Sequence, residues 1–225
     1  MSKPVVLIAE ELSPATVEAL GPDFDVINVD GTDRPALLKA LANADAILVR
    51  SATQVDAEAI AAAPKLKVVA RAGVGLDNVD IKASTNAGVM VVNAPTSNVI
   101  SAAELAIGQL MALSRHIPDA NASLKNGEWK RAKYTGVELY EKTIGIIGLG
   151  RIGIEMAKRA RGFDMEVHGF GHHWPEEATA LGITRHDSAD SLFAVSDVLS
   201  LHTKLTEQSR HTVNKERLAL LPKGA

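Results

Sequence analysis

Residues 143–160 read TIGIIGLGRIGIEMAKRA, and they contain the pattern G-x-G-x-x-G at 148–153. The pattern follows an apolar, β-rich run at 143–147 and opens a helical run at 152–161, which is the context that predicts a dinucleotide-binding turn. Its glycines permit a tight strand-to-helix turn and the close approach of a pyrophosphate, whose charge the start of the helix attracts. We therefore predict cofactor contacts at Gly148, Gly150, Arg151, Ile152 and Gly153.

The same fingerprint includes an acidic residue about 20 residues later, which binds the adenosine ribose. The next predicted strand, 165–169, is followed by Gly171 at that place, with His172 and His173 beside it. Two interpretations stay open. The missing carboxylate and the two histidines favour a dinucleotide with a 2′-phosphate, or the site has lost its ribose anchor and binds weakly. We predict NAD as the cofactor and keep NADP as the alternative.

Strand-like and helix-like segments alternate along the chain. In the first half, strands are predicted at 5–9, 24–29, 46–49, 68–70 and 89–92, with helices at 13–20, 36–42 and 57–63. In the second half, strands are predicted at 143–147, 165–169, 183–185 and 198–202, with helices at 152–161, 188–195 and 215–221. This alternation predicts α/β architecture with parallel sheets.

The segment between these halves holds a long apolar helix, predicted at 101–116. Ser101 and Glu104 match a capping box, in which the serine caps the helix and the glutamate reaches back. Because the helix is apolar on nearly all sides, we expect it deep in the protein or in a subunit interface. Residues 121–135 are polar and are predicted to form an exposed arm.

Composition excludes several classes of protein. The chain has 225 residues, a formal net charge of −3 and no cysteine. A general nucleic-acid binder would carry a basic face, and no apolar run approaches the ~18 residues that span a bilayer. Without cysteine there is no disulfide or thiolate metal site, and we predict no metal and a cytoplasmic location.

Four stretches carry a resemblance to a known family: VRSATQVDAEAI at 49–60, KLKVVARAGVGLDNVD at 65–80, NAPTSNVISAAELAI at 93–107 and TIGIIGLGRIG at 143–153. They resemble the D-isomer-specific 2-hydroxyacid dehydrogenases, and most closely the members that act on a phosphorylated acid. The resemblance implies a flavodoxin-like portion of a substrate domain at 1–97. It implies a Rossmann NAD(P)-binding domain at 98–225, incomplete at its carboxyl end, and a homodimer formed through helix 101–116.

The resemblance also implies site residues. Contacts to the phosphate and carboxylate of the substrate fall on Arg50, Ser51, Arg71, Gly73, Val74, Gly75 and Asn98, and further cofactor contacts fall on His202 and Thr203. Their chemistry fits, because arginine forks suit carboxylates and phosphates and glycines let backbone N–H groups reach an anion. Lys204 replaces the proline that is usual after His202 and Thr203, which puts the geometry of this loop in doubt.

The catalytic arginine, glutamate and histidine of the family follow the helix that ends here with ALLPKGA, and the sequence stops at Ala225. None of the seven histidines replaces the missing base convincingly, so we assign no catalytic residue. Two hypotheses follow: a dehydrogenase that transfers hydride between C2 of a 2-hydroxy acid and nicotinamide, or a catalytically incomplete, dimerising, dinucleotide-binding module. Glycerate or lactate is an alternative substrate. We also expect low stability, with strand 198–202 left as an apolar edge.

Overall fold

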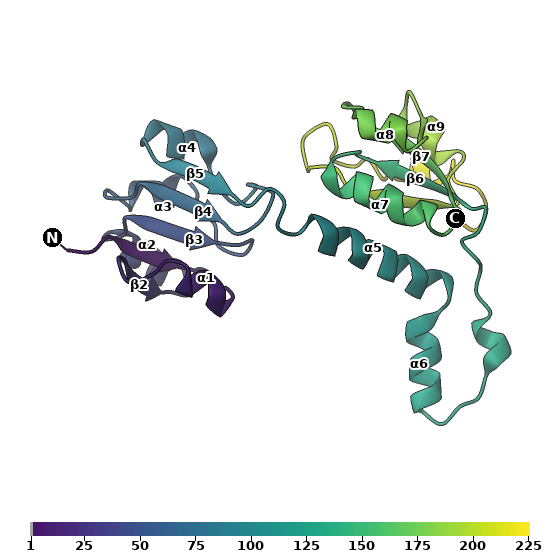
Figure 1. Ribbon diagram of the computed structural model, residues 1–225, viewed down its shortest axis with the longest axis horizontal. Coiled ribbons are helices and arrows are strands. Elements are labelled where there is room, and N and C mark those ends of the chain that lie inside the picture. Colours follow the sequence, from purple (N-terminus) through teal and green to yellow (C-terminus); the bar gives the residue numbers. More distant parts are fainter. Residues whose placement is uncertain (1) are drawn as a thin grey trace. The chain divides into compact units, whose positions relative to one another are not determined.

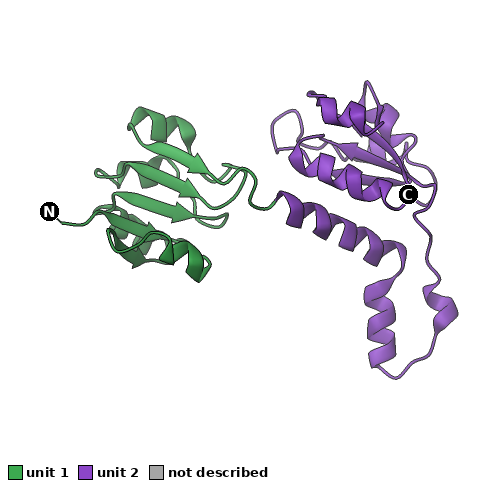
Figure 2. Ribbon diagram, viewed as in Figure 1, with its two compact units in different colours: residues 1–98 green, residues 99–225 purple. Residues whose placement is uncertain are grey.

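A computed structural model describes residues 2–225. The chain divides into two compact units, Met1–Asn98 and Val99–Ala225 (Figure 2). This division lies one residue beyond the domain boundary predicted from the sequence. Among residues 2–225, no helix is both long enough and apolar enough to cross a membrane.

The first unit is a parallel sheet whose strands alternate with helices (Figure 1). Its elements are β1 (Val5–Ile8), α1 (Pro14–Glu18), β2 (Asp25–Asn28), α2 (Arg34–Leu41), β3 (Ala46–Val49), α3 (Ala57–Ala61), β4 (Val68–Arg71), α4 (Ile81–Asn86) and β5 (Met90–Asn93). Within the described residues the strand order is β2-β1-β3-β4-β5, which is the flavodoxin-like order. The predicted fold class is confirmed for this unit.

The core of the first unit lies between its sheet and its helices. Leu7, Ile47 and Val69 stand side by side in register on β1, β3 and β4, and all three are buried. Burying each such side chain contributes roughly 1.5–3 kcal/mol. Leu37 and Leu41 of α2 close the same core, because residues four apart lie on one face of a helix.

The second unit begins with a helical segment and continues into a second parallel sheet. Its elements are α5 (Val99–Ser114), α6 (Ile117–Lys125), the 3-10 helix η1 (Arg131–Tyr134), β6 (Thr143–Ile147), α7 (Arg151–Arg161), β7 (Glu166–Phe170), α8 (Glu176–Ala180), β8 (Thr184–Arg185), α9 (Ala189–Phe193), β9 (Val198–Leu201) and α10 (Lys215–Leu218). Within the described residues the strand order β8-β7-β6-β9 matches the 3-2-1-4 part of the Rossmann order 3-2-1-4-5-6. The Rossmann prediction is confirmed, and β9 is an edge of this sheet.

Helices α5 and α7 pack against each other in the second unit. Ala103 and Leu110 of α5 are buried, and Glu104 forms an ion pair with Arg159 of α7 at 3.2 Å. Figure 1 shows α5 alongside α7, while α6 and η1 extend away from the sheet. β6 leads directly into α7 through Gly148, Leu149 and Gly150, so the amino end of α7 lies at the carboxyl end of β6.

The predicted capping box was wrong. Helix α5 begins at Val99, so Ser101 lies inside it and forms no capping box with Glu104, whose carboxylate instead pairs with Arg159. Within this chain Val99, Ala103 and Leu110 of α5 are buried, so the helix is not enclosed by its own chain, and its place in a subunit interface stays a prediction. The predicted arm at 121–135 contains the end of α6 and the whole of η1.

Candidate functional site

A cavity of about 630 Å³ lies at the carboxyl edge of the second sheet. Its wall is formed by residues that follow β6, β7, β8 and β9, together with the loop that leads to α10; they include Gly148, Gly150, Gly171, His172, His173, Asp187, Ser188, His202, Thr203, Lys204, Ser209, Thr212 and Arg217. In parallel α/β sheets, ligands bind outside the carboxyl ends of the strands. Of the predicted cofactor contacts, Gly148, Gly150, His202 and Thr203 line this cavity.

Two glycines let the turn from β6 into α7 pack closely. Gly148 has φ +91°, and a Cβ there would lie 2.8 Å from the carbonyl oxygen of His202. Gly153 lies in the first turn of α7, where a Cβ would overlap the carbonyl oxygen of Gly148. Gly153 is therefore buried and shapes the turn, and it does not line the cavity.

Gly150 has the opposite environment. It is the N-cap residue of α7, its φ of −74° is open to any residue, and a Cβ added there would meet no atom within 4 Å. No side chain caps this helix. The N–H groups at the start of a helix have no partner within it and attract anions. The arrangement therefore fits a pyrophosphate, for which a side chain at position 150 would be in the way.

The charges around the cavity favour an anionic ligand. Lys204 and Arg217 are its permanent cations, and Asp187 is the one carboxylate in its wall. His202 donates to or accepts from Ser200 Oγ through Nε2 at 2.8 Å, and burial lowers its pKa. His202 is consequently neutral near pH 7, and it has an internal partner as well as a place in the cavity wall.

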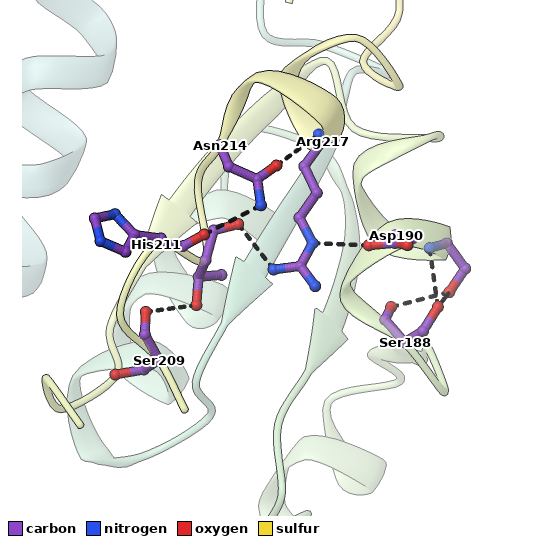
Figure 3. Close-up of polar contacts among 8 residues, drawn as sticks. Ser188, Asp190, Ser209, His211, Asn214 and Arg217 are labelled. Carbon is purple, nitrogen blue, oxygen red and sulfur yellow. Dashed lines mark hydrogen bonds and ion pairs between the residues drawn. The ribbon is translucent and has the colours of Figure 1, made fainter. Parts of the chain in front are cut away.

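Arg217 reaches the cavity from α10. Its Nε donates to Asp190 Oδ1 at 2.7 Å and its Nη1 donates to the carbonyl of Thr212 at 3.0 Å. Figure 3 shows this guanidinium between Asp190 on α9 and the chain near His211, with Asn214 capping α10. An ion pair this exposed contributes on the order of 0–1 kcal/mol, so its main effect is to hold the loop beside the cavity.

The predicted substrate contacts lie in the first unit: Arg50 and Ser51 follow β3, Arg71 ends β4 and residues 73–75 follow it, and Asn98 lies after β5. Arg71 Nε donates to the carbonyl of Arg50 at 3.0 Å, and Arg71 Nη1 lies 3.3 Å from Asp77 Oδ1. The Arg71 guanidinium also lies against Gly73 and Gly75. The carbonyl of Val74 accepts a hydrogen bond from Asn93 Nδ2 at 2.7 Å.

These contacts bring Arg50, Arg71 and residues 73–75 together. Asn98 is exposed at the end of the first unit and has no hydrogen bond to them within residues 2–225. Across the same residues, no group of three or more His, Asp or Glu side chains could hold a metal ion.

Sequence reasoning missed several residues of this cavity, among them Asp187, Ser188 and Arg217. β8 ends at Arg185, so Asp187 and Ser188 follow it after one residue, and their position after a parallel strand was a usable signal. Arg217 gave no such signal, because its side chain reaches the cavity only through the path of the loop from 204 to 214.

The family model for the NAD binding domain of the D-isomer specific 2-hydroxyacid dehydrogenases matches residues 107–225. The chain belongs to this family. The match places an NAD binding domain over the glycine turn and the cavity described above.

Similar proteins agree with this membership. The D-3-phosphoglycerate dehydrogenase of Mycobacterium tuberculosis (strain H37Rv) is 53% identical over 225 residues, which is 100% of this chain and 42% of the relative. A second D-3-phosphoglycerate dehydrogenase, from Methanocaldococcus jannaschii, is 42% identical over 98% of this chain and 42% of its own length. The chain thus spans less than half the length of these relatives.

Among solved structures, a glyoxylate reductase from Paecilomyes thermophila superposes with a TM-score of 0.85 at 29% identity, over 98% of this chain and 71% of that protein. The similarity covers both units of the present chain.

Proposed function

We propose that this chain is part of an NAD-dependent dehydrogenase that acts on a phosphorylated 2-hydroxy acid. The glycine turn carries the proposal, because Gly150 leaves open space at the start of α7 where a pyrophosphate would bind. The 53% identity to D-3-phosphoglycerate dehydrogenase supports 3-phosphoglycerate as the substrate and serine biosynthesis as the pathway.

In this proposal the cofactor is held by backbone N–H groups from Gly150 to Gly153 and by the cavity wall at His202 and Thr203. Bound nicotinamide supplies the hydride chemistry, and the protein supplies orientation. Gly171 leaves the choice between NAD and NADP open, because no carboxylate follows β7 to repel a 2′-phosphate. Asp187 is the one acidic residue in the wall of this cavity, and its negative charge would repel a 2′-phosphate, so we propose NAD as the cofactor.

The substrate anion is proposed to bind Arg50, Ser51, Arg71, the backbone of residues 73–75, and Asn98. In the structure, two of the three guanidinium nitrogens of Arg71 contact protein oxygens. Arg71 would therefore both hold the loop in place and bind the substrate. We assign no catalytic acid or base within this chain. A dinucleotide-binding module without chemistry therefore remains the second candidate.

We also propose a homodimer formed through α5. Leu105 and Leu113 of α5 are 63% and 77% exposed. Ile117 and Leu124 of the next helix, α6, are exposed as well. Such apolar surface is typical of a subunit interface. A second copy of the chain is the partner that fits a self-complementary helix face.

One assay separates the two candidate functions. Purified chain is mixed with 3-phospho-D-glycerate and NAD or NADP, and reduced nicotinamide is followed by absorbance while dinucleotide binding is measured by calorimetry. Binding with turnover supports the dehydrogenase. Binding without turnover supports the non-catalytic module, and the absence of binding by either dinucleotide contradicts both.

A further inference from the structure

The loop at 50–53, between β3 and α3, is held by a carboxylate from another strand end. Glu10 follows β1, and its Oε1 accepts hydrogen bonds from the N–H groups of Arg50 at 2.8 Å and Thr53 at 3.0 Å. Its Oε2 accepts from the N–H of Ala52 at 3.2 Å. Three of the four N–H groups of this loop therefore point at one side chain.

The carbonyl groups of the loop are held from the other side. Asn78 is 3% exposed, and its Nδ2 donates to the carbonyls of Arg50 at 2.9 Å and Thr53 at 2.6 Å. Arg71 Nε donates to the same Arg50 carbonyl at 3.0 Å. Glu10 and Asn78 therefore hold both ends of the loop, at Arg50 and at Thr53, through hydrogen bonds from distant parts of the chain.

This arrangement leaves a small set of donors unused. Within residues 2–225, the N–H and hydroxyl of Ser51 and the guanidinium of Arg50 have no hydrogen-bond partner. The Thr53 hydroxyl also has none, but it is buried and cannot reach a ligand. The side chains of Ser51 and Arg50 are exposed. These two residues are also the ones proposed above to bind the substrate anion, so the loop offers its free donors where the anion is expected.

Glu10 is ionised in this position. Its burial opposes ionisation, but the hydrogen bonds from the backbone of Thr53, Arg50 and Ala52 outweigh it, and the pKa of the carboxyl is lowered from its usual 4.5. A negative charge beside an anion site would by itself weaken anion binding. Its presence there requires a geometric reason.

We propose that Glu10 and Asn78 are positioning residues: they lock the 50–53 loop so that Ser51 and Arg50 present their free donors to the phosphate or carboxylate of the substrate. The inference rests on the proposed function of this loop. If Glu10 positions the loop, removing its charge weakens anion binding. Electrostatics alone predicts the opposite, because the lost negative charge no longer repels the anion.

The test uses the full chain labelled with ¹⁵N and titrated with 3-phospho-D-glycerate or inorganic phosphate. In Glu10→Gln one amide N–H₂ group must face a backbone donor, so the loop loses at least one charge-assisted hydrogen bond. We expect the affinity reported by the Ser51 amide shift to fall at least about tenfold. The matched control is Glu11→Gln, which removes the same charge from the neighbouring residue; Glu10, Glu11 and Arg50 line one pocket of the first unit, but the Glu11 side chain has no hydrogen bond to the loop within residues 2–225. Its affinity should be unchanged or slightly higher.

NAD affinity, measured in parallel, should be the same in both variants, since the dinucleotide cavity lies in the other unit. If wild-type Ser51 responds and Glu10→Gln binds as tightly as wild type, the positioning role is overturned while the substrate proposal stands. If wild-type Ser51 responds to neither anion, the substrate role of the loop is overturned and the positioning role with it.

A measurement on the wild-type chain alone keeps the inference testable if Glu10→Gln does not fold. The amide shifts of Arg50, Ala52 and Thr53 should titrate together as the pH falls below about 4.5, when Glu10 takes up its proton. The Ser51 amide should exchange with solvent faster than these three. Independent titration of the three amides, or a protected Ser51 amide, would contradict the arrangement.

Discussion

At the scale of single residues, one chain of polar contacts joins β7 to the segment that follows β8 and to α9. His168 Nδ1 lies 2.9 Å from His186 Nε2, and His186 Nδ1 lies 3.0 Å from Ser191 Oγ. The Ser191 hydroxyl donates to the carbonyl of Ser188, so it accepts from His186 Nδ1–H. His186 Nε2 then accepts from His168 Nδ1–H, and His168 Nε2 carries the lone pair.

This order of donors and acceptors decides where His168 takes up a proton. A proton on His168 Nε2 leaves the contact between the two rings intact, and Glu166 Oε2 lies 4.0 Å from that atom. Burial lowers the pKa of His168, and the charge of His186 lowers it further.

We therefore predict that the second unit loses stability as the solution becomes mildly acidic. The folded pKa of His168 lies below its usual 6.5, so the stabilisation is complete above 6.5 and is lost as the pH falls through the folded pKa. Urea unfolding between about pH 7.5 and about pH 5.5 measures it. His168→Gln should reduce this dependence, and the part that remains is expected from the buried His202, whose pKa is also lowered. An equally steep slope in the variant would contradict the role of His168.

Residues whose role is local were predictable, and those whose role depends on distant contacts were not. The GLGRIG pattern predicted the turn at Gly148 and the helix start at Gly150, because both are properties of a few adjacent residues. Glu10 was not identified, because its importance comes from N–H groups about 40 residues away in sequence. Arg217 was missed for the same reason.

At the scale of elements, strands and strongly capped helices were predicted within a few residues. Ser13, Asp33 and Asp56 cap α1, α2 and α3 with their side chains, and such short polar residues before apolar runs are readable signals. Helices α4, α6 and α8 were missed, although Asp80 caps α4. Helix α5 was predicted, but its start was misplaced because the Ser–Glu spacing of a capping box also occurs inside helices.

The proposed dimer helix gives a prediction at this scale. Leu113→Arg places a charge on the exposed side of α5, and we expect it to shift the chain from dimer to monomer, as measured by sedimentation at micromolar concentration. The matched control is Leu205→Arg, at an 81% exposed leucine in the loop near the cavity. A wild-type chain that sediments as a monomer, or a Leu113→Arg chain that remains a dimer, would contradict this interface.

At the scale of the whole molecule, the chain combines two parallel sheets with different strand orders. Both were predictable as α/β units, because buried parallel strands are continuous apolar runs separated by helices. The strand orders themselves came from the resemblance, since periodicity does not say which strands are neighbours. The family membership fixes the second unit as an NAD binding domain, and its open glycine turn is the feature on which the account depends.

Calorimetric titration of the full chain with NAD and NADP tests that feature most directly, with two variants that each add one methyl group. Gly150→Ala adds a Cβ that meets no protein atom but occupies the space proposed for the pyrophosphate; Gly108→Ala adds one on α5 that is equally unhindered. We predict saturable dinucleotide binding by wild type and Gly108→Ala, and a loss of at least about tenfold in Gly150→Ala. The thermal unfolding of Gly150→Ala should fall only slightly, because alanine is a poorer N-cap than glycine. Equal affinity in all three proteins, or no binding by the wild-type chain, would contradict the account.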